Sequence, residues 1–168
     1  SEEELHSEIQ RLLTLLNMKT SIYNVETREG IDGKAYIMEV SPRGGGNRLA
    51  EMIRYATGMD LIESAVKAAV GDSVIGLEQK KYDGYWAEYV LHSFENGKFK
   101  ELYIEPQIRE NNLKELDLWV NPGDEVHTFT AANYAIGTVV LKFNSKDEME
   151  TIMRSMNEKI KVIVEEDK

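Results

Sequence analysis

The dipeptide Asp32-Gly33 lies between two runs of residues that favour β-strands, and it constrains the fold more than any other feature of the chain. An Asp-Gly pair in this setting is the strongest short-range signal for a β-hairpin. The runs cover residues 20–29 and 34–41. A two-residue loop between them pairs Ile31 with Lys34. We therefore expect an antiparallel hairpin in which every residue has an assigned partner across the strands.

This register places two carboxylates opposite each other. Glu26 lies across from Glu39. Asn24 likewise lies across from Ser41, and the period of two along a strand puts all four side chains on one face, with Arg43 continuing the row. Opposite Cβ atoms on one face are about 5 Å apart, so two ionised carboxylates destabilise the hairpin unless a positive charge lies between them.

Three groups can supply that charge: a shared proton, the guanidinium of Arg28 or Arg43, or a divalent metal ion. Oxygen donors with no His or Cys nearby suit Mg²⁺ or Mn²⁺ rather than Zn²⁺. Magnesium takes one or two carboxylates and completes its shell with water and substrate phosphates, so a metal here predicts a nucleotide as well. The alternative is a surface hairpin in which the two arginines balance the acids.

The segment after the hairpin suits an anion. Arg43 is followed by Gly44, Gly45, Gly46 and Asn47, and a helical pattern starts directly afterwards. Free N–H groups and the positive end of the helix dipole attract anions, and glycines let a ligand approach the backbone closely. An adjacent arginine adds a bidentate charge. The segment therefore predicts a phosphate or carboxylate site, and the alternative is an ordinary loop and helix cap.

Patterns along the whole chain predict an α+β fold, with mostly antiparallel sheet and flanking helices. The chain is expected to form one domain or two regions, 1–83 and 84–168. Helical patterns cover residues 2–17, a segment from Leu49 to Gly58 and one from Asp60 to Gly71. In the second half we expect strands at 85–92 and 98–104 joined by an Asn96-Gly97 hairpin turn, and further strands at 125–130, 136–143 and 160–164. A helix is expected from Ser145 to residue 159, with Glu148 in a capping box. Residues 106–120 have no clear assignment.

Composition narrows the classes of partner. Thirty acidic and twenty basic residues give a net charge of -10, which disfavours nucleic acid and anionic lipid surfaces. The lack of cysteine excludes thiol nucleophiles and thiolate metal sites. No apolar run approaches the roughly 18 residues of a membrane span, so we expect a soluble, cytoplasmic protein. His92 and His127 have no second ligand at metal spacing, and we assign them no role.

The hairpin and the residues after it resemble the signature of the ATP-grasp ligases. The stretches that carry the resemblance are Asn24-Val25-Glu26, Asp32-Gly33-Lys34 and Ile37 to Gly45, within a similar region of about residues 22–72. In outline, that family reads Asn-Val-Glu, a strand, a turn and Glu-x-Asn-Pro-Arg. Its members, which include carbamoyl phosphate synthase, biotin carboxylase and purine-pathway ligases, use ATP to make an acyl phosphate that a nitrogen nucleophile attacks.

The resemblance implies roles for individual residues. Glu26 and Glu39 would bind the Mg²⁺ or Mn²⁺ that bridges the ATP phosphates, and Ser41, where the family usually has Asn, would be a further ligand. Arg43 would be the catalytic residue that meets phosphate or the acyl-phosphate intermediate. The residues expected to contact the nucleotide are Asn24, Arg43, Gly44, Gly45 and Asn47.

The resemblance also implies that the chain is the C-terminal portion of a longer enzyme, because the family's ATP pocket needs an upstream sheet with a glycine-rich loop and lysines. We expect part of an ATP- and magnesium-dependent ligase that joins a carboxylate to an amine or ammonia. It would act with ATP, a carboxylate substrate and the missing N-terminal part, and be inactive alone; a homodimer is left open. The alternative is a catalytically silent binding module or subunit derived from the same fold.

Overall fold

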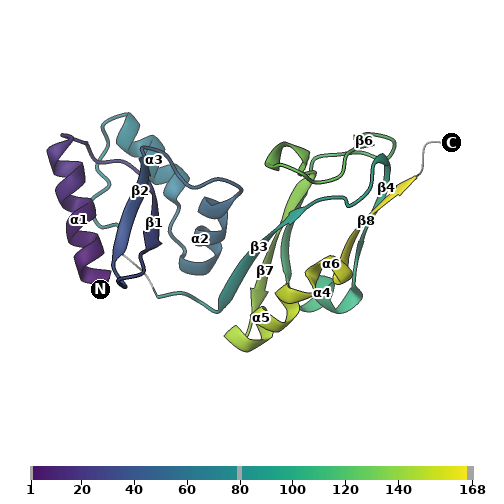
Figure 1. Cartoon of the computed structure of the whole chain (residues 1–168). Helices are drawn as coiled ribbons and strands as arrows, with labels where there is room; N and C mark the ends of the chain where they lie inside the picture. Colours follow the sequence, from purple (N-terminus) through teal and green to yellow (C-terminus); the bar gives the residue numbers. More distant parts are fainter. Residues whose placement is uncertain (1, 79–80, 166–168) are drawn as a thin grey trace. The chain divides into compact units, whose positions relative to one another are not determined.

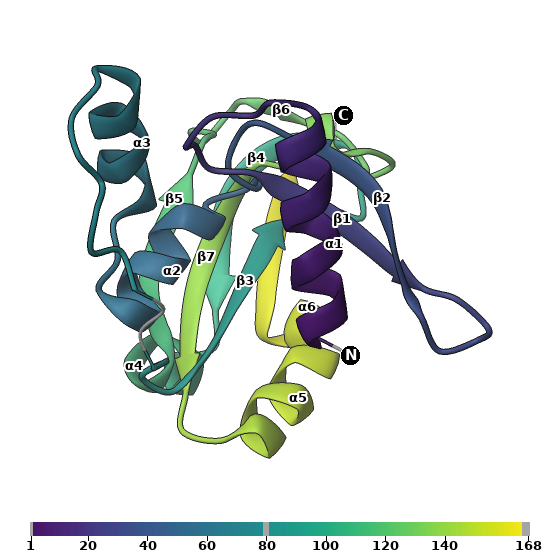
Figure 2. The same ribbon diagram turned by 90° about the vertical axis from the view of Figure 1, so that its left-hand side faces the viewer.

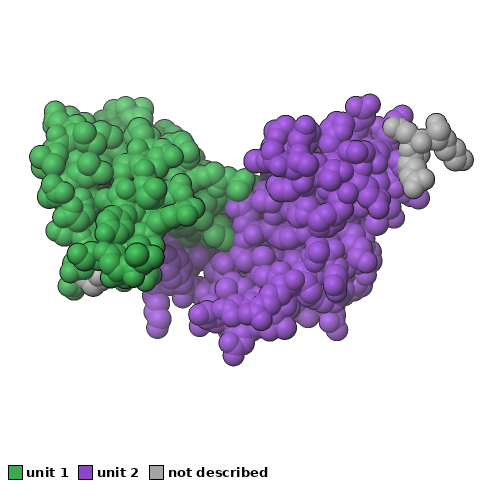
Figure 3. All heavy atoms as spheres, viewed as in Figure 1, with its two compact units in different colours: residues 1–54, 59–79 green, residues 55–58, 80–168 purple. Residues whose placement is uncertain are grey.

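The computed structural model describes residues 2–78 and 81–165 and has the expected α+β class (Figure 1). The chain divides into two compact units, coloured green and purple in Figure 3. Unit 1 comprises residues 1–54 and 59–79, and unit 2 comprises residues 55–58 and 80–168. None of the described helices is long and apolar enough to cross a membrane.

The described residues of unit 1 form three helices and one two-stranded antiparallel sheet. Figure 2 shows α1 running alongside the hairpin. Asn17 adopts a left-handed conformation with φ of 52° just after α1, and Asp60 caps α3 by accepting a hydrogen bond of 2.8 Å from the N–H of Glu63. The elements are α1 (Glu2–Leu15), β1 (Asn24–Glu29), β2 (Ala35–Ser41), α2 (Leu49–Thr57) and α3 (Leu61–Ala69), and the last residues of α2 belong to unit 2.

The turn of the β1–β2 hairpin is longer than predicted. The N–H of Gly30 donates to the carbonyl of Lys34 at 2.8 Å, so the loop has three residues. Gly33 has φ of +74°, the left-handed conformation that ends a three-residue loop of this kind. Asp32 stabilises the loop by accepting a hydrogen bond of 3.1 Å from the N–H of Lys34. The predicted pairing of Ile31 with Lys34 is therefore wrong.

A β-bulge in β2 restores the predicted register further along. Thr27 pairs with Ile37, whereas the preceding residue, Glu26, pairs with Glu39. Met38 is thus an extra residue in β2, and it offsets the one-residue shift that the longer loop introduces. The two carboxylates face each other as predicted, although the sequence argument reached this pairing without the longer loop or the bulge.

The described residues of unit 2 form two three-stranded antiparallel sheets, with strand orders β3-β7-β5 and β6-β4-β8. Figure 1 shows the α-helices between residues 106 and 159 near one end of the sheets. The elements are β3 (Tyr85–Leu91), β4 (Gly97–Ile104), α4 (Pro106–Asn111), β5 (Leu113–Leu118), β6 (Glu125–Val126), the 3-10 helix η1 (Ala132–Tyr134), β7 (Gly137–Phe143), α5 (Lys146–Arg154), α6 (Met156–Lys159) and β8 (Ile160–Glu165). The core residues are Leu91, Phe99, Ile104, Ile108, Val126, Ile136, Val139, Leu141, Phe143, Met156 and Ile160.

The second predicted hairpin is wrong, because β3 and β4 belong to different sheets. The hydroxyl of Ser93 donates to the carbonyl of Glu95 at 2.7 Å and accepts from its N–H at 3.1 Å, which turns the chain out of the first sheet. Gly97 then starts β4, which lies so close to β8 that a Cβ at this position would be 2.5 Å from the carbonyl oxygen of Glu165. The Asn96-Gly97 pair therefore leads from one sheet into the other.

The remaining elements refine the sequence assignments. The unassigned segment 106–120 contains α4 and β5, and the strand expected at 125–130 has only two residues. The helix expected up to residue 159 is divided into α5 and α6 at Ser155. The predicted cap is confirmed, since the N–H of Glu148 donates to the hydroxyl of Ser145 at 3.1 Å, while the Glu148 carboxylate accepts from the N–H of Asn144 at 2.8 Å.

Candidate functional site

The paired glutamates of the hairpin form no ion pair with any described residue. Glu26 and Glu39 are both exposed and directly opposite each other. Within residues 2–78 and 81–165, no ion pair links either carboxylate to Arg28 or Arg43. Without such an ion pair, the two carboxylates are a place where a bound cation would be stabilising.

Two neutral oxygen donors lie next to the carboxylates. The hydroxyl of Ser41 donates to Oε1 of Glu39 at 2.5 Å, which places these two side chains on the same face of the hairpin. Asn24 pairs with Ser41 across the strands, as the sequence predicts. A hydroxyl keeps two lone pairs while it donates its proton, so Ser41 can hold Glu39 and still offer an oxygen to a metal ion.

The glycines after Arg43 form an open backbone segment beside Asn24. A Cβ at Gly45 would lie 2.6 Å from Cδ2 of Leu49 and 3.4 Å from Oδ1 of Asn24, so this position cannot accept a side chain without movement. A Cβ at Gly44 or Gly46 would meet nothing within 4 Å. The backbone at these two positions is thus accessible to a ligand from outside, which is the property that an anion site needs.

Two residues with a left-handed backbone conformation lie between the three glycines and the start of α2. Asn47 and Arg48 have φ of 56° and 82°, both left-handed. The guanidinium of Arg43 donates from Nη1 to the carbonyl of Gly44 at 2.9 Å, so it lies against its own loop. The structure thus brings Asn24, Glu26, Glu39 and Ser41 together in the hairpin, and it places Arg43 to Asn47 in the loop that follows.

The donor set fits a hard divalent cation. Among the described residues, no three His, Asp or Glu side chains gather closely enough to form a complete protein-only metal site. Magnesium does not need such a cage, because it commonly takes one or two carboxylates and fills its octahedron with water and phosphate oxygens. Glu26 and Glu39 with the neutral oxygens of Ser41 and Asn24 match that preference, whereas Zn²⁺ prefers N and S ligands.

An apolar cavity of about 310 Å³ adjoins this site within unit 1, and the sequence argument did not predict it. Asn24, Gly44 and Gly45 form its polar side. The sequence feature that could have predicted this cavity is the recurrence of apolar residues at successive turns of α3. The other lining residues are Ile22, Tyr23, Leu49, Ala50, Ile53, Leu61, Ile62, Ala65 and Val66.

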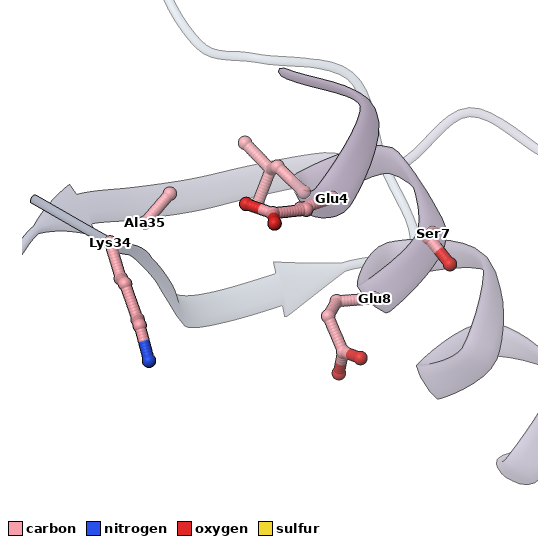
Figure 4. A pocket seen from close by; sticks show the side chains of 6 residues that line it. Glu4, Ser7, Glu8, Lys34 and Ala35 are labelled. Carbon is pink, nitrogen blue, oxygen red and sulfur yellow. The ribbon is translucent and has the colours of Figure 1, made fainter. Parts of the chain in front are cut away.

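A second hollow in unit 1, of about 450 Å³, lies between α1 and the hairpin (Figure 4). Its lining includes Glu4 and Glu8 of α1 and the residues Lys34 and Ala35 at the turn end of the hairpin. The Glu26 and Glu39 pair is absent from this lining, so the hollow is separate from the candidate site.

The two histidines singled out in the sequence behave as ordinary side chains. His92 lies among the rings of Phe94 and Phe129, with centroid distances of 5.0 and 4.9 Å, and its Nδ1 contacts the carbonyl of Val90 at 2.8 Å. His127 contacts the ring of Tyr134. Both rings are thus in contact with aromatic side chains.

No protein-family profile and no curated protein sequence matches the chain. Solved structures do match. An L-amino acid ligase from Bacillus licheniformis has a TM-score of 0.79 at 16% identity, over 96% of this chain and 40% of that chain. A phosphoribosylglycinamide synthetase from Anaerococcus prevotii has a TM-score of 0.77 at 19% identity, over 95% of this chain and 41% of that chain. The biotin carboxylase domain of a Hydrogenobacter thermophilus 2-oxoglutarate carboxylase, solved with MgADP, ADP and bicarbonate, has a TM-score of 0.68 at 15% identity, over 96% of this chain and 36% of that chain. This chain therefore spans about two fifths of the length of these three proteins.

Proposed function

We propose a function that starts from the fold. The chain has the fold of the C-terminal part of the ATP-grasp ligases, as the sequence predicted. We infer that the chain is part of an ATP- and Mg²⁺-dependent ligase that activates a carboxylate and joins it to an amine or ammonia. Residues 1–83 would carry the metal-binding hairpin, and residues 84–168 would complete and extend the fold. The rest of the enzyme would supply the remaining nucleotide contacts.

The observation that carries this proposal is the pair of exposed carboxylates. Glu26 and Glu39 face each other with no ion pair to any described residue. Like charges directly opposite each other across strands are destabilising, so a cation bound between them would stabilise the hairpin. Magnesium bound with a nucleotide matches both the charge and the oxygen chemistry.

In this proposal each residue has one task. The bound metal, once present, would neutralise phosphate charge and orient the nucleotide. Glu26 and Glu39 would hold the metal from the two strands, and the hydroxyl of Ser41 would fix the rotamer of Glu39 through its hydrogen bond of 2.5 Å. The open backbone at Gly44 would let anionic oxygens approach.

Arg43 would act on the charge that develops at the reacting phosphate. In the structure its guanidinium donates to the adjacent carbonyl of Gly44, and its side chain is exposed, so a rotation of the side chain frees the fork for an anion. A guanidinium binds phosphate or carboxylate oxygens in bidentate fashion. Asn24, which lies opposite Ser41 in the hairpin, and Asn47, in the loop before α2, would contribute polar contacts to the same ligand.

One feature favours a second candidate, a catalytically silent module of the same fold. Ser41 stands where the ATP-grasp signature usually has Asn, and a hydroxyl on a shorter side chain is a weaker metal ligand than an amide oxygen. A silent module would keep the fold and bind metal poorly.

Substitution of the paired acids in the complete ligase distinguishes these candidates. Glu39→Gln and Glu26→Gln remove one negative charge each without changing size. We expect each to lower turnover with Mg-ATP at least 100-fold, since loss of one electrostatic partner at a reacting phosphate typically costs 10²–10³ in kcat. The control is Glu29→Gln, an exposed acid at the turn end of β1. Unchanged turnover in Glu39→Gln with an intact circular dichroism spectrum would overturn the proposal.

A further inference from the structure

A cavity of about 280 Å³ lies within unit 2, and the proposed function makes no use of it. Two segments of the chain line this cavity. One is residues 92–95, directly after β3, and the other comprises Asn157 of α6 and the first four residues of β8, elements that are labelled in Figure 1. Small-molecule sites usually measure about 300–1,000 Å³, so the cavity suits a ligand of the size of a small metabolite.

The two segments bring opposite charges to the cavity. Glu95 belongs to the first segment, whereas Lys161 and the side-chain amide of Asn157 belong to the second. Among the described residues, neither Glu95 nor Lys161 forms an ion pair. An ionised carboxylate only accepts hydrogen bonds, and an ammonium group only donates them. The cavity therefore favours a ligand that carries a cationic donor and an anionic acceptor together.

An apolar surface accompanies these charged groups. Phe94 is 65% exposed, and its ring makes an edge contact with the ring of His92 at a centroid distance of 5.0 Å. The side chains of Ile160 and Val162 add aliphatic surface to the lining, and Ile160 is buried. An exposed aromatic ring beside a cavity is a surface that an apolar group of a ligand can cover.

We propose that this cavity binds an α-amino acid with a large apolar side chain, as the zwitterion. An α-amino acid carries an ammonium group, a carboxylate and a side chain on one carbon atom, which are the three groups that the lining selects. The ammonium group meets Glu95, the carboxylate meets Lys161 and Asn157, and the side chain covers Phe94. All lining residues belong to unit 2 and none belongs to the β1–β2 hairpin or its loop, so the inference goes beyond the proposed function.

Titration of the isotope-labelled 168-residue chain with L-phenylalanine, followed by NMR without metal or nucleotide, tests this proposal. We expect the amide signals of residues 92–95 and 157–163 to shift first. Two analogues separate the charged contacts, because phenylpropionate lacks the ammonium group and phenethylamine lacks the carboxylate. Each analogue should bind at least about tenfold more weakly than L-phenylalanine, since each loses its hydrogen bonds to one charged group.

Two substitutions assign the contacts to residues. Glu95→Gln should weaken the binding of L-phenylalanine and phenethylamine but leave that of phenylpropionate unchanged. Lys161→Gln should weaken the binding of L-phenylalanine and phenylpropionate but leave that of phenethylamine unchanged. The matched controls are Glu101→Gln and Lys100→Gln, which change the net charge equally on β4 outside the cavity lining. All four side chains are exposed, so the variants are expected to keep the fold.

Three results would overturn the proposal: no shift of the cavity amides at the solubility limit of L-phenylalanine, equal affinities for L-phenylalanine and both analogues, or unchanged affinities in Glu95→Gln and Lys161→Gln. The proposed function fails or holds separately. Glu39→Gln should lower turnover in the complete ligase but leave L-phenylalanine binding to the chain unchanged. Binding that follows the expected pattern, together with full turnover in Glu39→Gln, would support the amino acid site while contradicting the metal site.

Discussion

Ser41 is the residue at which the hairpin departs from the ATP-grasp signature, and it gives the sharpest test at the residue scale. Its hydroxyl orients Glu39 through a hydrogen bond of 2.5 Å, and it lies opposite Asn24. We expect Ser41→Asn to strengthen Mn²⁺ binding several-fold, because an amide oxygen reaches further and is a better ligand for a hard cation. Ser41→Ala should weaken binding. Isothermal titration with Mn²⁺ measures both, and equal affinities in all three proteins would remove Ser41 from the site.

A second residue-scale prediction concerns Gly137 at the start of β7. A Cβ there would lie 2.3 Å from the carbonyl oxygen of Asp117, and its φ is +158°. We expect Gly137→Ala to destabilise unit 2 by about 3 kcal/mol or more, since backbone has to move in a packed sheet. At Gly123, with φ of +96° and open space, the same substitution should cost only about 1 kcal/mol. Urea unfolding followed by tryptophan fluorescence compares the two, and similar losses would contradict the steric argument.

At the scale of elements, the β1–β2 hairpin shows which features of a turn the sequence predicts and which it does not. Local chemistry predicted the turn, because Asp32 and Gly33 have few alternatives to a tight loop. Loop length and the bulge at Met38 depend on strand twist and on side chains across the pair, which no short pattern encodes. The two deviations cancel at Glu26 and Glu39, so the site register was correct and the turn register was wrong.

The second hairpin failed for a related reason. Asn96-Gly97 has the composition of a hairpin turn, but the strands on either side have different partners, β7 for β3 and β8 for β4. Strand partners distant in sequence are decided by packing of the whole sheet, and turn composition carries no information about them. The apolar cavity beside the site was missed likewise, because it arises from α2, α3 and β1 together.

The cap of α5 gives a pH-dependent prediction. The N–H of Asn144 donates to the Glu148 carboxylate and holds the pKa of Glu148 below its usual value. A carboxyl group with a lowered pKa in the folded state stabilises the protein above its unfolded pKa, and that stabilisation is lost as the pH falls through the folded pKa. We expect Glu148→Gln to be less stable than the native protein at pH 6, with the difference shrinking below about pH 4. Denaturant unfolding at both pH values checks this, and a constant difference would contradict it.

At the scale of the whole molecule, the core and the candidate site occupy different units. The buried apolar cluster lies in unit 2, while the paired carboxylates and the glycine loop lie in unit 1. The α+β class was predictable because helical spacing and strand patterns are local signals, and the fold was predictable from the resemblance of the hairpin and its following loop to a known family. The division into residues 1–83 and 84–168 and the proposed roles of the site residues stay predictions; these residues are Asn24, Glu26, Glu39, Ser41, Arg43, Gly44, Gly45 and Asn47.

This arrangement predicts what the chain does by itself. It spans about two fifths of the length of the two ligases with the highest TM-scores described above. In the proposed function, the rest of the enzyme supplies the remaining nucleotide contacts. We expect the isolated chain to bind Mg-ATP more weakly than millimolar and to show no turnover. Calorimetry with Mg-ATP and a phosphate-release assay measure these properties. Tight nucleotide binding by the chain alone would show that the pocket is complete without further residues.

The central claim is that Glu26 and Glu39 together hold a divalent cation, and paramagnetic broadening by Mn²⁺ tests it most directly. The amides of the isotope-labelled chain are followed by NMR during a titration with Mn²⁺. The claim predicts that amides of residues 24–26 and 39–41 broaden first, and that Glu26→Gln and Glu39→Gln each suppress this effect, whereas Glu29→Gln does not. Broadening spread evenly over the acidic surface, or unchanged in the two variants, would contradict the claim.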